Sequence, residues 1–307
     1  MKQDLSLTHL NEKTKALMDL SDELRIQRIR GTHWIGYTRA KHILVKLEEL
    51  VTHPKTHRMP NLLIVGDTNN GKTMIVNRFQ QRYPANDNPS GDAIIYPVMI
   101  VQAPPIPDEG RFYEEILEML SAPYKPKDSP SQKQIQVITI LKNISLKILI
   151  IDEIHDILAG KPAQQRHFRN TIKYLGNKLK IPIVGVGVKE AFSILQSDPQ
   201  LANRFEPVIL PRWEMGKQYE RLLASFEVML PLKNPSHLYE TNMALKLLSM
   251  SEGLIGELSS ILTQAAVLAI RTKTEQIDDR MLRKIKWIQP SDRKRADQLP
   301  DEIDDEE

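Results

Sequence analysis

The sequence predicts an α/β protein in which a parallel β-sheet lies between two layers of helices, followed by a domain made only of helices. Five strand-length apolar runs alternate with helix-length segments between residues 61 and 210, and no such run follows Trp213. Runs that are apolar throughout are typical of strands buried on both faces by helices. A glycine-rich loop directly after the first of these strands indicates a nucleotide site.

The five expected strands are short and end near turn-forming residues. They are NLLIV at 61–65, IIYPVMIV at 94–101, KILII at 147–151, IPIVGV at 181–186 and VIL at 208–210. Apolar residues at helical spacing mark helices before and between them, at 43–51, 74–82, 112–120, 164–179 and 191–196. Strands that alternate with helices in this way predict an αβα sandwich.

After Trp213 only helical patterns remain. They cover 218–229, 241–251, 255–272 and 278–288, with a proline-containing loop at 230–236. We therefore expect four segments, namely a helical leader (1–27), a nucleotide-binding domain (28–215), a helical lid domain (216–289) and an acidic tail (290–307).

Charge is unevenly distributed along the chain. The 42 Lys and Arg residues against 39 Asp and Glu give a net charge of +3. Residues 291–307 contain eight acidic and three basic residues, so this end carries −5 and the rest +8. The basic body suits a polyanionic partner. The tail has almost no apolar content and is expected to be disordered, either as a solubilising end or as a competitor for a basic surface.

Several classes of protein are excluded by composition. The chain of 307 residues has no Cys, which excludes disulfide scaffolds, thiolate zinc sites and Cys nucleophiles. No apolar run approaches the roughly 18 residues that a membrane span needs. The N-terminal residues lack the apolar core of a signal peptide. We expect a cytoplasmic protein without a membrane partner.

The strongest motif is a complete GxxxxGK[ST] sequence between the first strand and a helix. Its residues are Gly66, Asp67, Thr68, Asn69, Asn70, Gly71, Lys72 and Thr73. Glycines let the backbone N–H groups of such a loop face phosphates, and the helix N-terminus adds its positive dipole. Lys72 is expected to reach the β- and γ-phosphates of ATP, and the Thr73 hydroxyl to bind Mg²⁺.

A second element supplies two carboxylates. Asp152 and Glu153 directly follow the apolar run at 148–151. A buried strand brings Asp152 to the edge where it can hold the Mg²⁺ shell, and Glu153 beside it can take a proton from the attacking water.

With both elements the chain resembles AAA+ ATPases, and further segments resemble the TniB/TnsC class of transposition ATPases, TniB most closely. These segments are WIGYTRA (34–40), VQAPPIPDEGRFYEEILEMLSAPY (101–124), LIIDEIHDIL (149–158), LANRFEPVILPRWE (201–214), LLASFEVMLPLKNPS (222–236) and SEGLIGELSSILTQAA (251–266). The resemblance covers roughly residues 25–290. Two of its stretches, ILPRWE (209–214) and LPLKNPS (230–236), argue against a helicase loader or initiator.

The resemblance implies further site residues. Ile35, Gly36 and Tyr37 stand where such proteins hold the adenine; packing in the core is the alternative. Arg204 matches the arginine finger that reaches the γ-phosphate of a neighbouring subunit, which makes hydrolysis depend on assembly. A local ion pair is the alternative for Arg204.

Two positions depart from the AAA+ pattern. Val188 stands at the end of the fourth strand, where many relatives carry a polar sensor, with Lys189 as a substitute beside it. Glu257 stands in the region of a second sensor arginine and cannot make that contact. Both departures favour slow hydrolysis, with ATP binding as the main switch.

Nucleic-acid contacts are expected on a flexible stretch between the second and third strands. Its lysines are Lys125, Lys127 and Lys133, and this region faces the central pore of ring ATPases. A second basic cluster occupies 271–286. Solvated surface lysines would produce the same pattern in either place.

The expected function is that of an ATP-dependent DNA transposition protein. By its resemblance it binds and hydrolyses ATP with Mg²⁺, assembles as a ring or filament on double-stranded DNA, and links this DNA to a transposase and a target-selection protein. Two alternatives stay open. One is a nucleotide-gated DNA scaffold with little hydrolysis, and the other is an ATPase similar to helicase loaders or initiators.

Overall fold

The computed structural model describes residues 7–196 and 199–293 and divides into two compact units. Residues 36–211 form one, called here the sheet unit. Residues 7–35 and 212–293 form the other, called the helical unit. This division differs from the four expected segments, because the N-terminal residues group with the C-terminal helices instead of forming a separate leader.

The sheet unit is built on five parallel strands. They are β1 (Asn61–Gly66), β2 (Val98–Gln102), β3 (Ile148–Asp152), β4 (Ile183–Gly187) and β5 (Phe205–Leu210). Their order is β2-β3-β4-β1-β5, and every pair is parallel. The prediction of a five-stranded parallel sheet is confirmed, and the carboxyl ends of β1, β3 and β4 therefore meet at one edge.

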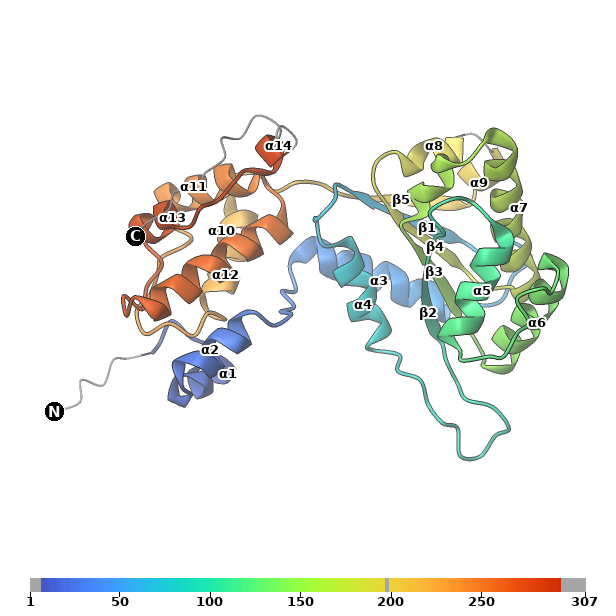
Figure 1. Cartoon of the computed structure of the whole chain (residues 1–307), viewed down its shortest axis with the longest axis horizontal. Coiled ribbons are helices and arrows are strands. Elements are labelled where there is room, and N and C mark those ends of the chain that lie inside the picture. Colours follow the sequence, from blue (N-terminus) through green and yellow to red (C-terminus); the bar gives the residue numbers. More distant parts are fainter. Residues whose placement is uncertain (1–6, 197–198, 294–307) are drawn as a thin grey trace. The chain divides into compact units, whose positions relative to one another are not determined.

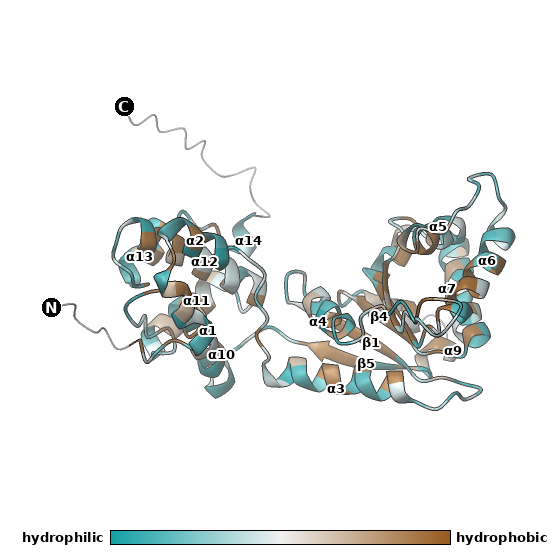
Figure 2. Cartoon of the chain, turned by 90° about the horizontal axis from the view of Figure 1, so that it is seen from below, coloured by the Kyte–Doolittle hydropathy of each residue, from teal (hydrophilic) through white to brown (hydrophobic). Residues whose placement is uncertain are grey.

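Helices cover both faces of this sheet (Figure 1). One face carries α3 (Thr38–Thr52) and α4 (Lys72–Gln80); the other carries α5 (Glu109–Met119), α6 (Pro130–Asn143), α7 (Pro162–Leu179), α8 (Ala191–Gln196) and α9 (Pro199–Ala202), with a 3₁₀ helix η2 (Ile154–Ala159). Figure 2 shows apolar strands between helices whose outer sides are hydrophilic. Phe112 and Phe168 meet edge to face at 5.2 Å between ring centroids in the core beneath α5 and α7. The αβα sandwich is thus as expected.

Local differences from the predicted elements have physical reasons. β2 begins at Val98 and not at 94, since Pro97 has no N–H to donate to a neighbouring strand. The helix α6 was not predicted, and a flexible stretch was expected at its start. Ser129 and Gln132 form a capping box there, and Pro130 occupies the first turn, where its missing N–H costs nothing.

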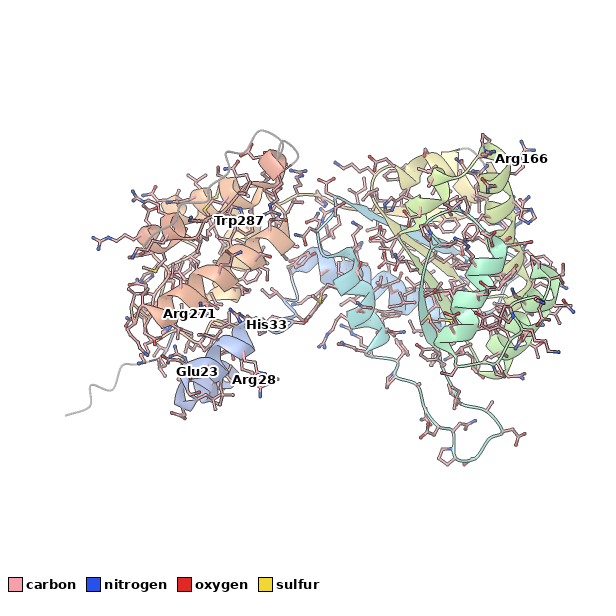
Figure 3. All side chains as sticks on the ribbon, viewed as in Figure 1. Glu23, Arg28, His33, Arg166, Arg271 and Trp287 are labelled. Carbon is pink, nitrogen blue, oxygen red and sulfur yellow. The ribbon has the colours of Figure 1, made fainter. Side chains whose placement is uncertain are left out.

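The helical unit contains α1 (Glu12–Lys15), η1 (Ala16–Asp19), α2 (Asp22–Ile29), α10 (Lys217–Glu227), α11 (Thr241–Ser251), α12 (Ile255–Arg271), α13 (Asp279–Lys284) and α14 (Pro290–Arg293). α13 is shorter than the predicted 278–288 helix. Figure 3 shows Glu23 and Arg28 on α2, which packs against α12 near Arg271. The N-terminal helices therefore complete the hydrophobic core of this unit.

A buried ion pair holds α2 in place. The Arg25 side chain is 1% exposed and pairs with Glu275, a residue 250 positions away. Its Nε also donates to the carbonyl oxygen of Pro231 at 3.1 Å. Glu227 stabilises the same loop, because its carboxylate accepts hydrogen bonds of 2.9 Å from the backbone N–H groups of 236, 237 and 238.

Residues 290–293, placed in the acidic tail by the sequence, form the short helix α14. The N–H of Ser291 donates to Glu252 at 2.8 Å. The remaining tail residues, 294–307, lie outside the described residues.

Within the described part of the chain, no single helix is long and apolar enough to cross a membrane. α11 and α12 reach that length and composition only as a pair bent by 115°.

Replacing Glu275 by Gln should destabilise the helical unit by up to about 3–5 kcal/mol, because the buried Arg25 would keep only Asp22, 3.2 Å away, as a counter-charge. All three Trp residues, Trp34, Trp213 and Trp287, lie in this unit, so their fluorescence in urea reports its unfolding. Lys15→Gln is the control, since it breaks the exposed pair with Glu12 and should cost less than about 1 kcal/mol. Equal midpoints for the two variants would contradict the role of this ion pair.

Candidate nucleotide-binding site

The phosphate loop can take its shape because of its two glycines. Gly71 adopts φ +83° directly before α4, a conformation that favours glycine. Gly66 lies against β5, and a Cβ atom there would be 2.7 Å from the carbonyl oxygen of Leu210. Any larger residue at 66 would push the loop away from β5.

Lys72 lies inside this loop. Its ammonium donates to the carbonyl oxygens of Gly66 at 2.9 Å and Asp67 at 2.8 Å, and the residue is only 6% exposed. Burial lowers the pKa of Lys72, while Glu153, Asp152 and Asp67 act in the opposite direction. The ammonium is therefore placed where phosphate oxygens can replace the carbonyl groups as its partners.

The metal-binding candidates of the two motifs meet. The Thr73 hydroxyl donates to one carboxylate oxygen of Asp152 at 2.8 Å, although 79 residues separate them. The other oxygen of Asp152 accepts the backbone N–H of Glu153 at 2.9 Å. A hydroxyl beside a buried carboxylate is the pair of oxygen ligands that Mg²⁺ uses together with nucleotide phosphates.

Asn70 has a role that the motif did not reveal. Its amide donates to the carbonyl oxygens of Leu210 and Pro211, at 2.9 Å each, and the residue is 1% exposed. It therefore ties the middle of the phosphate loop to the end of β5. Thr68, Asn69 and Thr73 of the loop are exposed, and Asn69 adopts φ +59°.

Two further side chains border the expected site of the attacking water. His155 Nδ1 lies 3.2 Å from a carboxylate oxygen of Glu153, and a Cβ at Gly187 would be 3.2 Å from the same nitrogen. The sequence analysis missed His155, although it stands two residues after Glu153. Lys189 Nζ lies 3.5 Å from Asp67 of the phosphate loop, which supports Lys189 as the charged group beside Val188.

Arg204 lies far from the phosphate loop of its own chain. Its carbonyl oxygen accepts the N–H of Asn61, at the amino end of β1, whereas the loop begins at the other end of that six-residue strand. The two ends are roughly 16 Å apart at about 3.3 Å per residue. Arg204 donates to the Asn177 side chain at 2.9 Å. It can therefore act only on the site of a neighbouring copy or as a local structural group.

The residues expected to contact adenine span the point in the sequence where the helical unit ends and the sheet unit begins. Ile35 is the last residue of the N-terminal part of the helical unit, and Gly36 is the first residue of the sheet unit. Burial raises the pKa of Tyr37 to about 12. The adenine role of Ile35 and Tyr37 stays a prediction.

Glu257 has a structural partner. Both of its carboxylate oxygens accept hydrogen bonds from Arg293, at 3.0 and 2.7 Å. The guanidinium of Arg293 also lies 4.8 Å from the centre of the Trp287 ring. Glu257 thus fixes α14 to α12.

The candidate DNA contacts separate into two groups. Lys125 and Lys127 are exposed in the connection between α5 and α6. The expectation of an open loop is wrong for Lys133, which lies in α6, is 4% exposed and pairs with Glu114 at 2.6 Å. Its ammonium is already neutralised, so we remove it from the candidates. In the 271–286 cluster, Lys273 pairs with Asp22 and Arg283 with Asp279.

The residues present fit a nucleotide with Mg²⁺. Gly66 lets the loop lie close against β5, Lys72 supplies a cation inside the loop, and Thr73 with Asp152 supplies oxygen ligands. Among the described residues, no group of three His, Asp or Glu forms a separate metal site.

Comparison with solved structures gives the fold of AAA+ ATPases. The Aeropyrum pernix ORC2 protein in its ADPNP and ADP complexes matches with a TM-score of 0.60 and 15% identity, over 84% of this chain and 70% of that chain. The Aeropyrum pernix ORC1 protein in complex with DNA matches with a TM-score of 0.57 and 15% identity, over 84% and 67%. Cdc6p from Pyrobaculum aerophilum gives 0.55 and 15%, over 84% and 68%.

Comparison with curated proteins gives no match. Comparison with protein families matches residues 25–215 to the family described as Bacterial TniB protein. This match includes the phosphate loop, the Asp152–Glu153 pair and Arg204, and it covers well over half of the chain. The chain therefore belongs to the TniB family.

Proposed function

We propose that this protein is an ATPase of DNA transposition. In this proposal it binds ATP with Mg²⁺ at the phosphate loop, hydrolyses it slowly in a ring or filament of several copies, and links double-stranded DNA to a transposase and a target-selection protein. The observation that carries the ATPase part is the contact between Thr73 and Asp152, which joins the two nucleotide motifs into one site. TniB family membership supports the transposition part, and we place the protein in the cytoplasm.

The residues divide the chemistry among them. Lys72 balances the charge of the β- and γ-phosphates, and the loop N–H groups hold them in position. Thr73 and Asp152 would hold Mg²⁺, whose charge would offset that of the same oxygens. Glu153 orients the water and accepts its proton as the oxygen attacks the γ-phosphorus, while the bond from this phosphorus to the β,γ-bridging oxygen breaks and ADP leaves. His155, whose Nδ1 lies 3.2 Å from a carboxylate oxygen of Glu153, can fix the direction of that carboxylate.

A nucleotide-gated scaffold is the second candidate, and two observations favour it. Val188 has no polar group to offer at the end of β4, and Glu257 is engaged by Arg293. Such a scaffold would bind ATP and DNA with little turnover. Phosphate release measured with and without duplex DNA separates the two candidates, since only an assembly-dependent ATPase accelerates when DNA is added.

Lys72→Ala should weaken ATP binding about 10- to 100-fold, because a charge-assisted hydrogen bond to phosphate contributes about 1.5–3 kcal/mol. Anisotropy of a fluorescent ATP analogue measures this directly. Lys41→Ala, an exposed lysine on α3, is the control and should leave affinity unchanged. Similar affinity for the Lys72 variant and the parent would refute the assignment of the phosphate loop.

Glu153→Gln should retain ATP binding but lower turnover about 10²- to 10⁴-fold, since the amide cannot accept the proton of the water. Phosphate release under saturating ATP gives the rate. Asp156→Asn removes a nearby acid and should change the rate little. If both variants turn over at the parental rate, another group must serve as the base.

Arg204→Ala should bind ATP normally but lose hydrolysis about 10³-fold or more, together with ATP-dependent assembly, because its guanidinium would act on a neighbour. Mixing this variant with Lys72→Ala should restore activity. In a random 1:1 mixture about a quarter of the head-to-tail interfaces join an intact phosphate loop to an intact Arg204.

The matched control for this mixture replaces its second component with the double variant Lys72→Ala/Arg204→Ala, which offers no intact Arg204. Activity should not return in that mixture. Absence of rescue by the single variant, despite demonstrated co-assembly, would show that Arg204 is only the local partner of Asn177.

A further inference from the structure

A groove lined by lysines lies at the amino edge of the sheet, opposite the phosphate loop. It has a volume of about 760 Å³. Its basic residues are Lys55, Lys142, Lys147, Lys178 and Lys180, with His53 at one end. We call this set the amino-edge groove.

The fold itself brings these lysines together. Lys142 and Lys178 stand in the last turns of α6 and α7, Lys147 directly precedes β3, and Lys180 lies three residues before β4. Both helices run back from the carboxyl edge, so their ends and the starts of two strands share one border. Lys55 joins them from the connection between α3 and β1.

Charge in the groove is of one sign. None of its lining residues is Asp or Glu, and none of its five lysines forms an ion pair with another described residue. The helix C-termini favour a cation at Lys142 and Lys178 but do not explain Lys55, Lys147 or Lys180. Five exposed ammonium groups around one hollow repel each other, and a bound polyanion removes this repulsion.

The adjoining hollow extends the positive surface. It shares His53 and Met59 with the groove and is also lined by His57 and Arg58, again without a carboxylate. Exposed cations spread over two adjoining hollows suit a ligand with repeated phosphates better than a single phosphate, which needs a closed site with converging donors.

We infer that the amino-edge groove binds the phosphate backbone of duplex DNA. This inference rests on the proposed DNA partner and places a DNA contact at the end of the sheet opposite the ATP site. Lysine contacts of this kind carry no base information, so the binding is independent of sequence and depends steeply on salt.

The test compares two triple variants of the full chain that lose the same charge. The groove variant carries Lys55→Gln, Lys142→Gln and Lys178→Gln. The control carries Lys13→Gln, Lys41→Gln and Lys217→Gln, three exposed lysines outside the groove. Binding to a 30-base-pair duplex is followed by anisotropy over a series of salt concentrations.

The slope of log K against log salt should be less negative by about 2 to 3 in the groove variant, since each of the three lost phosphate contacts contributes about −0.9. The control should keep the parental slope. If the parent binds DNA and both variants have the same slope, the groove assignment is wrong, while the proposed DNA partner stands. A parent that binds no duplex would overturn the proposed DNA partner as well.

Lysine acetylation tests the unmodified protein. Duplex DNA should protect Lys142, Lys147 and Lys178 more than the control lysines, and equal labelling would overturn the assignment. An acidic peptide is the competing occupant, and the sequence of 294–307 is the probe. If this peptide binds the parent but not the groove variant, while the DNA slope is unchanged, the groove binds acidic protein segments and not DNA.

Discussion

The site depends on the hydrogen bond between Thr73 and Asp152, which spans the width of β4. β4 separates these two strands, yet Thr73 after β1 must reach Asp152 at the end of β3. A Cβ at Gly185 would lie 2.8 Å from Ile154 and 2.9 Å from Leu63, whose side chains lie over β4 from both sides. A larger residue at 185 would have to displace the ends of these two side chains, one in β1 and the other in η2 directly after Glu153.

Parallel pairing also separates charge between the two ends of the sheet. Strands end at the carboxyl edge, where the phosphate loop, Asp152 and Glu153 gather. Helices α6 and α7 end at the amino edge, where their negative dipole ends favour lysine. The same topology thus places the Mg²⁺ and phosphate ligands at one edge and lysine side chains, without carboxylates beside them, at the other.

Sequence reasoning succeeded where the information is local. The apolar runs predicted the five strands, and spacing within eight residues predicted the phosphate loop. It failed where a contact joins distant segments, as for Arg25 with Glu275 or Asn70 with Pro211. Lys133 was misplaced because its acidic partner, Glu114, belongs to another helix. The capping box at Ser129 was a local signal for α6 that the analysis overlooked, as was His155 beside Glu153.

The phosphate loop is hydrogen-bonded to the segment in which the chain passes from the sheet unit to the helical unit, at Pro211 and Arg212. Asn70 holds the carbonyl groups of Leu210 and Pro211, and Pro211 is the last residue of the sheet unit. Arg212, the next residue, belongs to the helical unit, and the N–H of Trp213 donates to Gly253 within that unit at 2.8 Å. Only Arg212 therefore lies between Pro211, which accepts a hydrogen bond from the loop, and Trp213, which donates one within the helical unit. A loop that changes shape when phosphate replaces the carbonyl partners of Lys72 must either carry Pro211 with it or break the hydrogen bonds of Asn70.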